Sequence, residues 1–180
     1  MKRHTLVLTL CSLCLALISC SSEPKWADPE AHARTEELNK VYAPLLSGTW
    51  HTQHMSQTRR IFEQLTFESD GTLTGYRKWH GRELVTVQGE KVFTDWEEIA
   101  EMSGRFSSTW QLKHYDAVGD GKADYLIIHA EYDEEHFTVA YSSSLLFGEV
   151  NDTLLRIRGP YFTDDEGWTV YHRGASEPDF

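Results

Sequence analysis

The segment GRFSSTWQLKHY, residues 104–115, constrains the fold of this chain more than any other stretch. Its side chains divide into two alternating sets, because successive residues of an extended strand point to opposite faces. One set is Phe106, Ser108, Trp110, Leu112 and His114, and the other is Ser107, Thr109, Gln111, Lys113 and Tyr115. A period of two over ten residues predicts a β-strand with one buried face.

Several other segments have the pattern of short β-strands. RIFEQLTF and TLTGYRKW are joined by ESDG, which is typical of a β-hairpin. Further predicted strands are ELVTVQG, EKVFTDW, DYLIIHAEY, FTVAYSSSLLFGEV, TLLRIRG and GWTVYHRG. Eight to ten short strands with polar turns predict a mainly β, antiparallel barrel or sandwich. The segment 95–104, DWEEIAEMSG, could form a short helix instead.

One helix is predicted before the strands, at residues 29–43. Asp28 can cap it, and Pro29 suits its first position because that amide has no partner inside a helix. Ala31, Leu38, Val41, Tyr42 and Leu45 follow with nearly helical spacing, and Pro44 is expected to end the run.

The first residues have the form of a leader. Lys2 and Arg3 precede an apolar run that is too short for a mature membrane span, and the run ends in LISC at Cys20. This resembles the lipobox of bacterial lipoproteins, and an ordinary secretory signal is the alternative. The resemblance implies a signal peptide at 1–19, acylation (palmitate among the chains) of Cys20, a tether at 20–28 and one domain at 29–180. Because Ser21 follows the cysteine, we expect export to an outer membrane, with the protein anchored there by its lipid.

Cysteine and charge usage narrow the function classes. Cys11 and Cys14 lie in the leader, so the mature chain keeps no thiol for a disulfide, a zinc site or a nucleophile. The formal net charge is −11, and removal of Lys2 and Arg3 with an acid-free leader makes it −13. Such a surface repels nucleic acid and anionic lipid headgroups.

The segment LLSGTWHTQ, with Gly48 and Trp50 after a short helix, resembles the opening of lipocalin-like barrels. The resemblance implies an up-and-down barrel in which Trp50 closes one end and a late arginine packs over it. Arg156, Arg158 or Arg173 could be that arginine. An eight-stranded barrel can hold one small ligand. The predicted cavity is lined by Trp110, Tyr141 and His114, and Phe106, Ser108, Val139 and Ser143 share the inward faces.

Histidines and carboxylates give weaker hypotheses. His54, His114 and His172 could face one cavity and bind a metal or haem, although rim histidines near strand ends are the preferred interpretation. His51 and His54 point to opposite faces of a strand and form no metal motif. YDEEH (132–136) and TDDEG (163–167) could supply paired carboxylates for acid–base chemistry, but acidic residues between strands usually mark turns. No catalytic motif is present, and we expect no enzymatic activity.

DAVGDGKAD, residues 116–124, has the spacing of a degraded calcium loop. Asp116, Asp120 and Asp124 would provide carboxylates and Lys122 its carbonyl, with Gly121 at the sharp turn. Val118 occupies a ligand position without a side-chain oxygen. The alternative is a hairpin connection in which aspartate and glycine serve the turn.

Three functions remain open at this point. The chain could bind a small apolar ligand inside a barrel, it could be a structural or interaction module for another envelope protein, or it could be an enzyme that uses its acidic loops. A continuous apolar cavity would favour the first, and a closed core with an exposed apolar patch the second. Buried paired carboxylates would favour the third.

Overall fold

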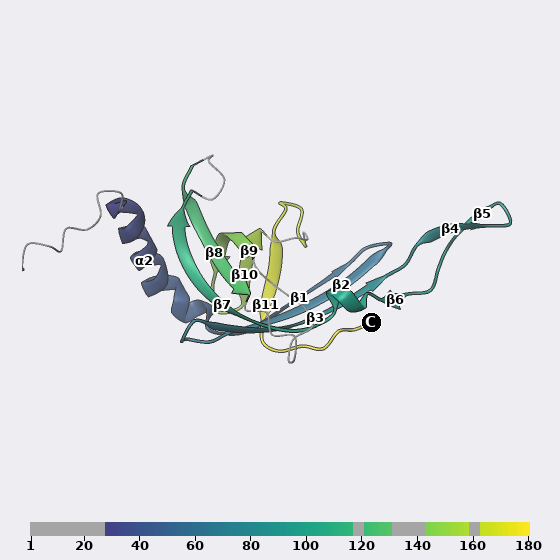
Figure 1. The fold of residues 1–180 in the computed structure, drawn as a ribbon, viewed down its shortest axis with the longest axis horizontal. Helices are drawn as coiled ribbons and strands as arrows, with labels where there is room; N and C mark the ends of the chain where they lie inside the picture. The colour runs from purple at the N-terminus through teal and green to yellow at the C-terminus, as the bar shows by residue number, and fades with distance from the viewer. Residues whose placement is uncertain (1–27, 117–120, 131–142, 159–162) are drawn as a thin grey trace, which may run out of the picture.

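The computed structural model of the protein describes residues 28–116, 121–130, 143–158 and 163–180. Eight antiparallel strands close into a barrel beside one α-helix (Figure 1). The barrel strands are β1 (Gly48–Met55), β2 (Arg59–Phe67), β3 (Thr72–Gly81), β7 (Gly104–Tyr115), β8 (Ala123–Ala130), β9 (Ser143–Val150), β10 (Leu154–Arg158) and β11 (Thr169–Arg173). The predicted mainly β, antiparallel barrel is thereby confirmed.

Each barrel strand pairs with the next barrel strand in the chain, and the last, β11, pairs with the first, β1. The longest pairing joins β2 and β3, from Arg59↔Gly81 to Phe67↔Leu73. The shortest is the seam between β11 and β1, where only Trp50↔Arg173 and His51↔His172 are in register. The last strand therefore closes the barrel over two residue pairs.

Between β3 and β7 the chain leaves the barrel. Here lie β4 (Leu84–Val87), β5 (Glu90–Phe93), β6 (Glu97–Glu98) and a 3-10 turn, η1 (Ala100–Met102). β4 and β5 form a separate two-stranded sheet, and β6 pairs with β3. The alternative of a helix over 95–104 is wrong apart from η1, because Glu97 and Glu98 take up ladder positions opposite Gly81 and His80.

The helix α2 spans Pro29–Leu46 and is three residues longer than predicted. Asp28 caps it as expected, with its Oδ1 atom accepting a hydrogen bond from the Ala31 amide at 3.0 Å. The expected stop at Pro44 is wrong. Proline removes one amide donor and crowds the preceding turn, but the continuing turn buries Leu46 completely in the core, which offsets that cost.

One apolar cluster of buried residues lies inside the barrel and joins it to the helix. Leu38 and Leu46 enter it from α2, with Tyr42 packed against it, at the four-residue spacing that places side chains on one face of a helix. On β7 the predicted alternation holds: Phe106, Ser108, Trp110 and Leu112 are buried. The other members of the cluster are Trp50, Leu65, Phe67, Leu73, Leu126, Ile128, Leu145, Phe147, Val150, Leu155, Ile157 and Tyr171.

The molecule is elongated. In Figure 1 the start of α2 lies at one end, the long strands β1, β2 and β3 run away from the barrel, and β4 and β5 lie at the opposite end. The yellow C-terminal segment runs along these long strands. It is held there by a hydrogen bond from the Ser176 amide to Gln64 at 3.1 Å and by the Phe180 ring, 5.2 Å from the ring of His80.

Candidate functional site

The hairpin at the far end, residues 82–96, is called the arm below. Its apolar side chains are unusually accessible: Leu84 is 50% exposed, Val87 52%, Val92 41% and Phe93 38%. The other large exposed apolar residues of the described chain are Val41, Met55 and Met102. Four of the seven large apolar residues that are exposed in the described chain thus lie on one short segment, as at protein–protein contact sites.

The arm carries apolar residues on both of its faces. Leu84 pairs with Phe93, and Val85 pairs with Val92. Residues directly opposite each other share a face, and neighbours along a strand alternate, so these two pairs lie on opposite faces. A hairpin of two four-residue strands is at best marginally stable alone in water. No described strand or helix covers either face.

Stacked arginines hold the base of the arm. The Arg82 guanidinium lies 4.2 Å from the centre of the Phe93 ring and 4.5 Å from that of Trp96, and Arg60 on β2 lies 4.2 Å from Trp96. Arg82 also donates from its Nε atom to the Gln57 carbonyl at 2.7 Å. These contacts fix the direction in which the arm leaves the barrel strands.

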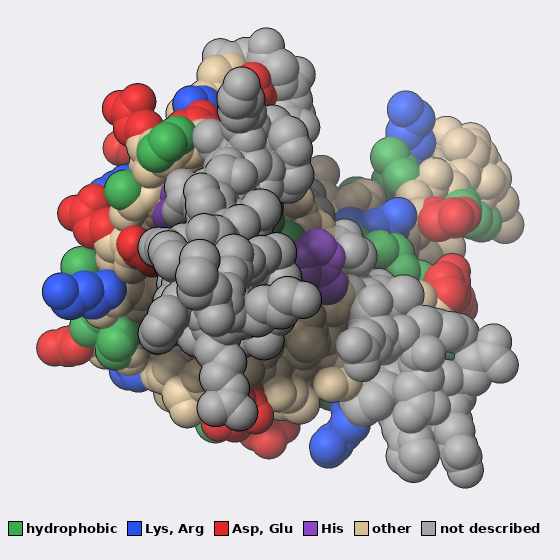
Figure 2. Space-filling model, turned by 60° about the vertical axis from the view of Figure 1, so that its left-hand side comes forward, with side chains coloured by type: hydrophobic (Ala, Val, Ile, Leu, Met, Phe, Trp, Pro, Cys, Tyr) green, Lys and Arg blue, Asp and Glu red, His purple; other side chains and the backbone are tan. Residues whose placement is uncertain are grey.

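An open groove of about 580 Å³ lies at the base of the arm. It is lined by Arg59, Arg82, the apolar residues Ile99 and Met102, and four glutamates: Glu83, Glu97, Glu98 and Glu101. Residues 82–102 contain two basic and six acidic side chains, a net charge of −4. The apolar arm therefore rises from an acidic base. Figure 2 brings forward the end of the molecule at which α2 begins, opposite the arm, and acidic side chains are prominent there as well.

The barrel interior has a different chemistry, since a polar group lies within the apolar core. Glu63 on β2 is fully buried, and its Oε2 atom accepts a hydrogen bond from the Nε atom of Arg77 at 2.6 Å. The Nη2 atom of Arg77 lies 2.5 Å from the same oxygen, as an ion pair. Its Oε1 atom accepts from the Tyr171 hydroxyl at 2.5 Å. Both carboxylate oxygens are thus satisfied by strands β3 and β11. Glu63 therefore connects β2 to β3 and β11. Burial of an ion pair costs desolvation energy, so the pair alone does not imply a net gain in stability.

The residues of the predicted cavity are not brought together as a ligand site in the described chain. Trp110 is packed at 5.4 Å against the Phe67 ring and donates to the Glu68 carbonyl at 3.0 Å. His114 is only half-buried and contacts Asp124. Tyr141 and Val139 lie outside the described residues. Ser143, the first residue of β9, is half-exposed.

Arg173 accounts for both the glycine and the tryptophan of the Gly-x-Trp segment. Arg173 lies 4.3 Å above the fully buried Trp50 ring, so among the three predicted candidates it is the one that stacks there. It also donates to the Ser47 carbonyl at 3.1 Å and to the Leu45 carbonyl, at the C-terminal end of α2, where a cation is favourable. Gly48 has φ +119°, and a Cβ atom there would lie 3.1 Å from the Arg173 Nη1 atom. Glycine is thus required by both its backbone angle and this close approach.

Two other arginines proposed for that role act elsewhere. Arg156 donates to Asp164 at 2.6 Å and Glu166 at 2.8 Å, and Arg158 lies 5.1 Å from the Trp168 ring. The TDDEG segment is therefore a turn held by Arg156. Hydrogen bonds from the Trp168 amide and from Arg156 keep the pKa of Asp164 below its usual value, the opposite of what a general acid needs. YDEEH lies outside the described residues.

The predicted calcium residues that are described make other contacts. Asp124 on β8 accepts from Arg34 Nη2 at 2.6 Å and from His114 Nδ1 at 2.7 Å, and Lys122 pairs with Asp28. Burial alone would raise the pKa of Asp124, but the hydrogen bonds from Arg34 and then His114 lower it. Asp120 and Val118 lie outside the described residues, and Asp116 is at the edge of that gap. Calcium binding stays a prediction, and a calcium ion would have to compete with Arg34 for the Asp124 carboxylate.

The histidines are dispersed. His51 and His172 lie near each other across the seam with ring centres 6.1 Å apart, whereas His114 lies by the helix and His54 is opposite Ile61 on β2. Within residues 28–116, 121–130, 143–158 and 163–180, no three His, Cys, Asp or Glu side chains are placed to hold a metal ion. The described helix is also not long and apolar enough to cross a membrane.

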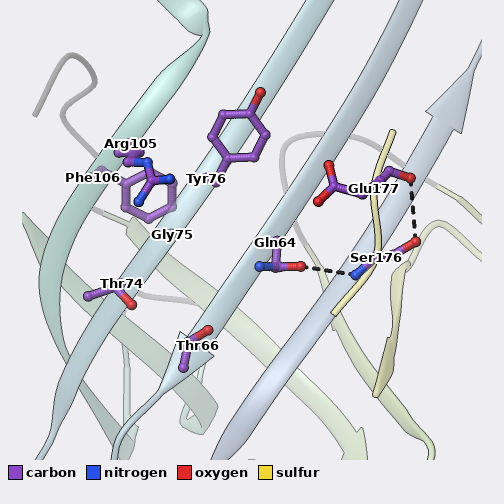
Figure 3. Close-up of a pocket in the computed structure, with 9 residues that line it drawn as sticks. All are labelled: Gln64, Thr66, Thr74, Gly75, Tyr76, Arg105, Phe106, Ser176 and Glu177. Carbon is purple, nitrogen blue, oxygen red and sulfur yellow. Dashed lines mark hydrogen bonds between the residues drawn. The ribbon is translucent and has the colours of Figure 1, made fainter. Parts of the chain in front are cut away.

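A second groove, also of about 580 Å³, lies on the outer face of β2, β3 and β7 (Figure 3). Gln64, Thr66, Thr74 and Tyr76 line it, and these alternate with the buried residues of the same strands. Arg105 and the C-terminal Ser176 and Glu177 complete its rim. It is open and polar, and it is separate from the barrel interior in which the cavity was predicted.

The arm was missed by sequence reasoning. ELVTVQG and EKVFTDW are correctly predicted as strands, yet they were counted among the strands of the barrel. Leu84 and Val85 are apolar neighbours facing Phe93 and Val92, but Leu126, Ile127 and Ile128 are also apolar neighbours on the barrel strand β8. The local pattern therefore does not separate this short hairpin from the strands of the barrel.

Comparison of the chain with protein-family models, curated proteins and solved structures finds no match.

Proposed function

We propose that this protein is a lipid-anchored, non-catalytic interaction module of the bacterial cell envelope, built on a lipocalin-like barrel. The observation that carries the proposal is the contrast between an apolar cluster of buried side chains inside the described barrel and an arm that exposes Leu84, Val87, Val92 and Phe93. Exposed apolar clusters of this kind bind protein partners. The arm is the binding surface, and its partner is another protein of the envelope.

The shape supports an anchored module. Lipidation at Cys20 leaves residues 20–28 before the helix, which reach at most about 30 Å when extended. The start of α2 and the arm lie at opposite ends of the molecule in Figure 1. The arm would therefore be presented away from the membrane surface, toward proteins at some distance from the anchor. An outer membrane is the location that Ser21 favours.

Binding of a small apolar ligand inside the barrel is the weaker hypothesis. Phe106, Leu112, Leu126 and Ile128 are almost completely buried against each other in the described core, and Glu63 with Arg77 places an ion pair in the same interior. Native mass spectrometry of the delipidated protein from its own host would weigh a retained ligand. Recovery of a constant added mass would favour the ligand hypothesis over ours.

The anchor is tested by Cys20→Ser. We expect the variant to move from the membrane fraction to the soluble fraction or to stay unprocessed. Correctly processed variant that remains in the membrane fraction would rule out the lipoprotein assignment.

The interaction role is tested by an arm variant with Leu84→Ser, Val87→Thr, Val92→Thr and Phe93→Ser. In detergent extracts of the native host, wild-type protein should sediment in an assembly larger than the single processed chain, and the arm variant should sediment alone. A matched control is Val41→Ser, which changes an exposed apolar residue on α2. Equal sedimentation of wild type and arm variant would contradict the proposal.

A further inference from the structure

The two-faced character of the arm restricts the shape of its partner. One face presents Leu84 and Phe93, and the other presents Val87 and Val92 beside the half-buried Val85. A flat surface could cover only one of these faces. A strand added to the edge of β4 or β5 would extend the ribbon and leave both faces in water. Only a concave partner removes both apolar faces from solvent.

The turn at the end of the arm is polar. Gln88 and Gly89 both have positive φ, 53° and 86°, which is the backbone of the tight turn that favours hairpins. Glu90 and Lys91 follow directly. The apolar band thus lies behind a charged tip. Insertion of such a tip into a bilayer would carry its charges into hydrocarbon first, which is costly. A protein cleft that is open beyond the tip has no such cost.

Charge selects between a foreign protein and a second copy. The base of the arm carries the glutamates Glu83, Glu97, Glu98 and Glu101, and the whole chain has a net charge of −11. A second copy would place these acidic groups against another negatively charged molecule. A partner whose cleft has a rim of lysine and arginine would meet them with the opposite sign, which favours association.

We propose that the arm inserts into an apolar cleft of a different protein, which contacts both faces of the β4–β5 ribbon and sets a basic rim on the glutamates at its base. This inference rests on the proposed function, and it specifies the partner by its shape and charge. The stacked Arg82, between Phe93 and Trp96, holds the ribbon in the direction in which it enters.

The test is photocrosslinking in the native host with p-benzoylphenylalanine at Leu84, at Val85 and, as a control, at His32 on the exposed side of α2. Leu84 and Val85 report the two faces. We expect one crosslinked species of the same mass from both arm positions and none from His32. A crosslink from one face alone would overturn the cleft but leave the interaction role intact. A product of twice the mass of the chain would show a second copy and overturn the partner. Absence of crosslinks at both arm positions would overturn the proposed function itself.

The charge of the rim is tested by Glu97→Lys with Glu98→Lys. The matched control is Glu30→Lys with Glu36→Lys on α2, which alters the net charge equally. The first pair should lower the crosslink yield at Leu84 by about fivefold or more, because rim charges steer association. The control should leave it unchanged. Equal losses in the two variants, at unchanged melting temperatures, would overturn the basic rim.

Discussion

Arginines lie over the tryptophan rings of Trp50, Trp96 and Trp168, and the surroundings of the first two rings differ. Arg173 covers Trp50, which is fully buried and donates from its indole N–H to the Leu46 carbonyl at 2.7 Å. Arg60 and Arg82 cover Trp96, which is only half-buried at the base of the arm. The first pair joins the helix, β1 and β11 into one core. The second pair fixes the orientation of the arm, which contributes little to that core. The same type of interaction thus stabilises the core in one place and orients an exposed segment in the other.

Removal of each tryptophan ring tests whether the two sites contribute differently to stability. Trp50→Ala should lower the free energy of unfolding by about 3–5 kcal/mol, because it leaves a large cavity in the core. Trp96→Ala should cost about 1 kcal/mol, as expected for exposed cation–π contacts. Denaturant titration of both variants measures the difference. Similar losses would mean that the arm is part of the cooperative core.

Buried and exposed glutamates offer a second contrast. Glu63→Ala strands Arg77 in the interior and should cost about 3 kcal/mol. We place it at the low end of the usual range because Arg77 keeps 7% of its surface in contact with water. Glu83→Ala, at the arm, should change stability by less than about 0.5 kcal/mol. The double variant Glu63→Leu with Arg77→Met should recover much of the loss, and a further decrease would show that the ion pair itself is net stabilising.

The junction of the helix and the barrel should be sensitive to acid. The pKa of Asp124 is below its ordinary value of 3.8 in the folded protein, where Arg34 and His114 bind the carboxylate. Its stabilisation is therefore complete above pH 3.8 and is lost as pH falls through the lowered folded pKa. Asp124→Asn should cost about 1 kcal/mol at neutral pH and flatten this part of the acid transition. An unchanged acid midpoint would contradict the pairing.

The smallest expected effect lies at the boundary between β3 and the arm. Burial, and then the charge of Lys78, lowers the pKa of His80 from its ordinary value of 6.5. The unfolded chain therefore binds the proton more tightly, and stability decreases slightly as pH falls below 6.5 toward the folded pKa. An NMR titration of the His80 ring should give a value below 6.5, and a higher value would show that Glu98 dominates its surroundings.

The sequence predicts the elements well and their assembly less well. The alternation at 104–115 and the ESDG turn are local signals, and the structure has both the strand and the hairpin. The choice of Arg173 over Arg156 and Arg158 could not be made in advance, because it depends on which strand closes against β1, more than a hundred residues away. Likewise the prediction that Pro44 ends the helix considers only its local effect on the backbone. The helix continues because Leu46 is buried in the core, and that is a tertiary contact.

The arm shows where local reasoning ends. Its strands and turn follow from the residues, but membership of the barrel is decided by pairing with distant strands. A hairpin with apolar residues on both faces satisfies the same local rules as one inside a sheet. Charge patterning gave a further hint, since the residues around Glu97 and Glu98 are acidic, but the groove they line exists only once β6 pairs with β3.

The seam between β1 and β11 has a consequence for the order of folding. Its two residue pairs join strands that lie at opposite ends of the domain sequence, whereas β2 and β3 are neighbours joined by a tight turn. Closure of so long a loop carries a large entropic cost before any contact is gained, so we expect the meander to form first and the ring to close last. Arg173 then stabilises the closed barrel specifically, because its stack on Trp50 and its hydrogen bonds to the end of α2 form only when β11 pairs with β1. Hydrogen exchange should accordingly be fastest along this seam among the barrel strands, and the native state should open there first.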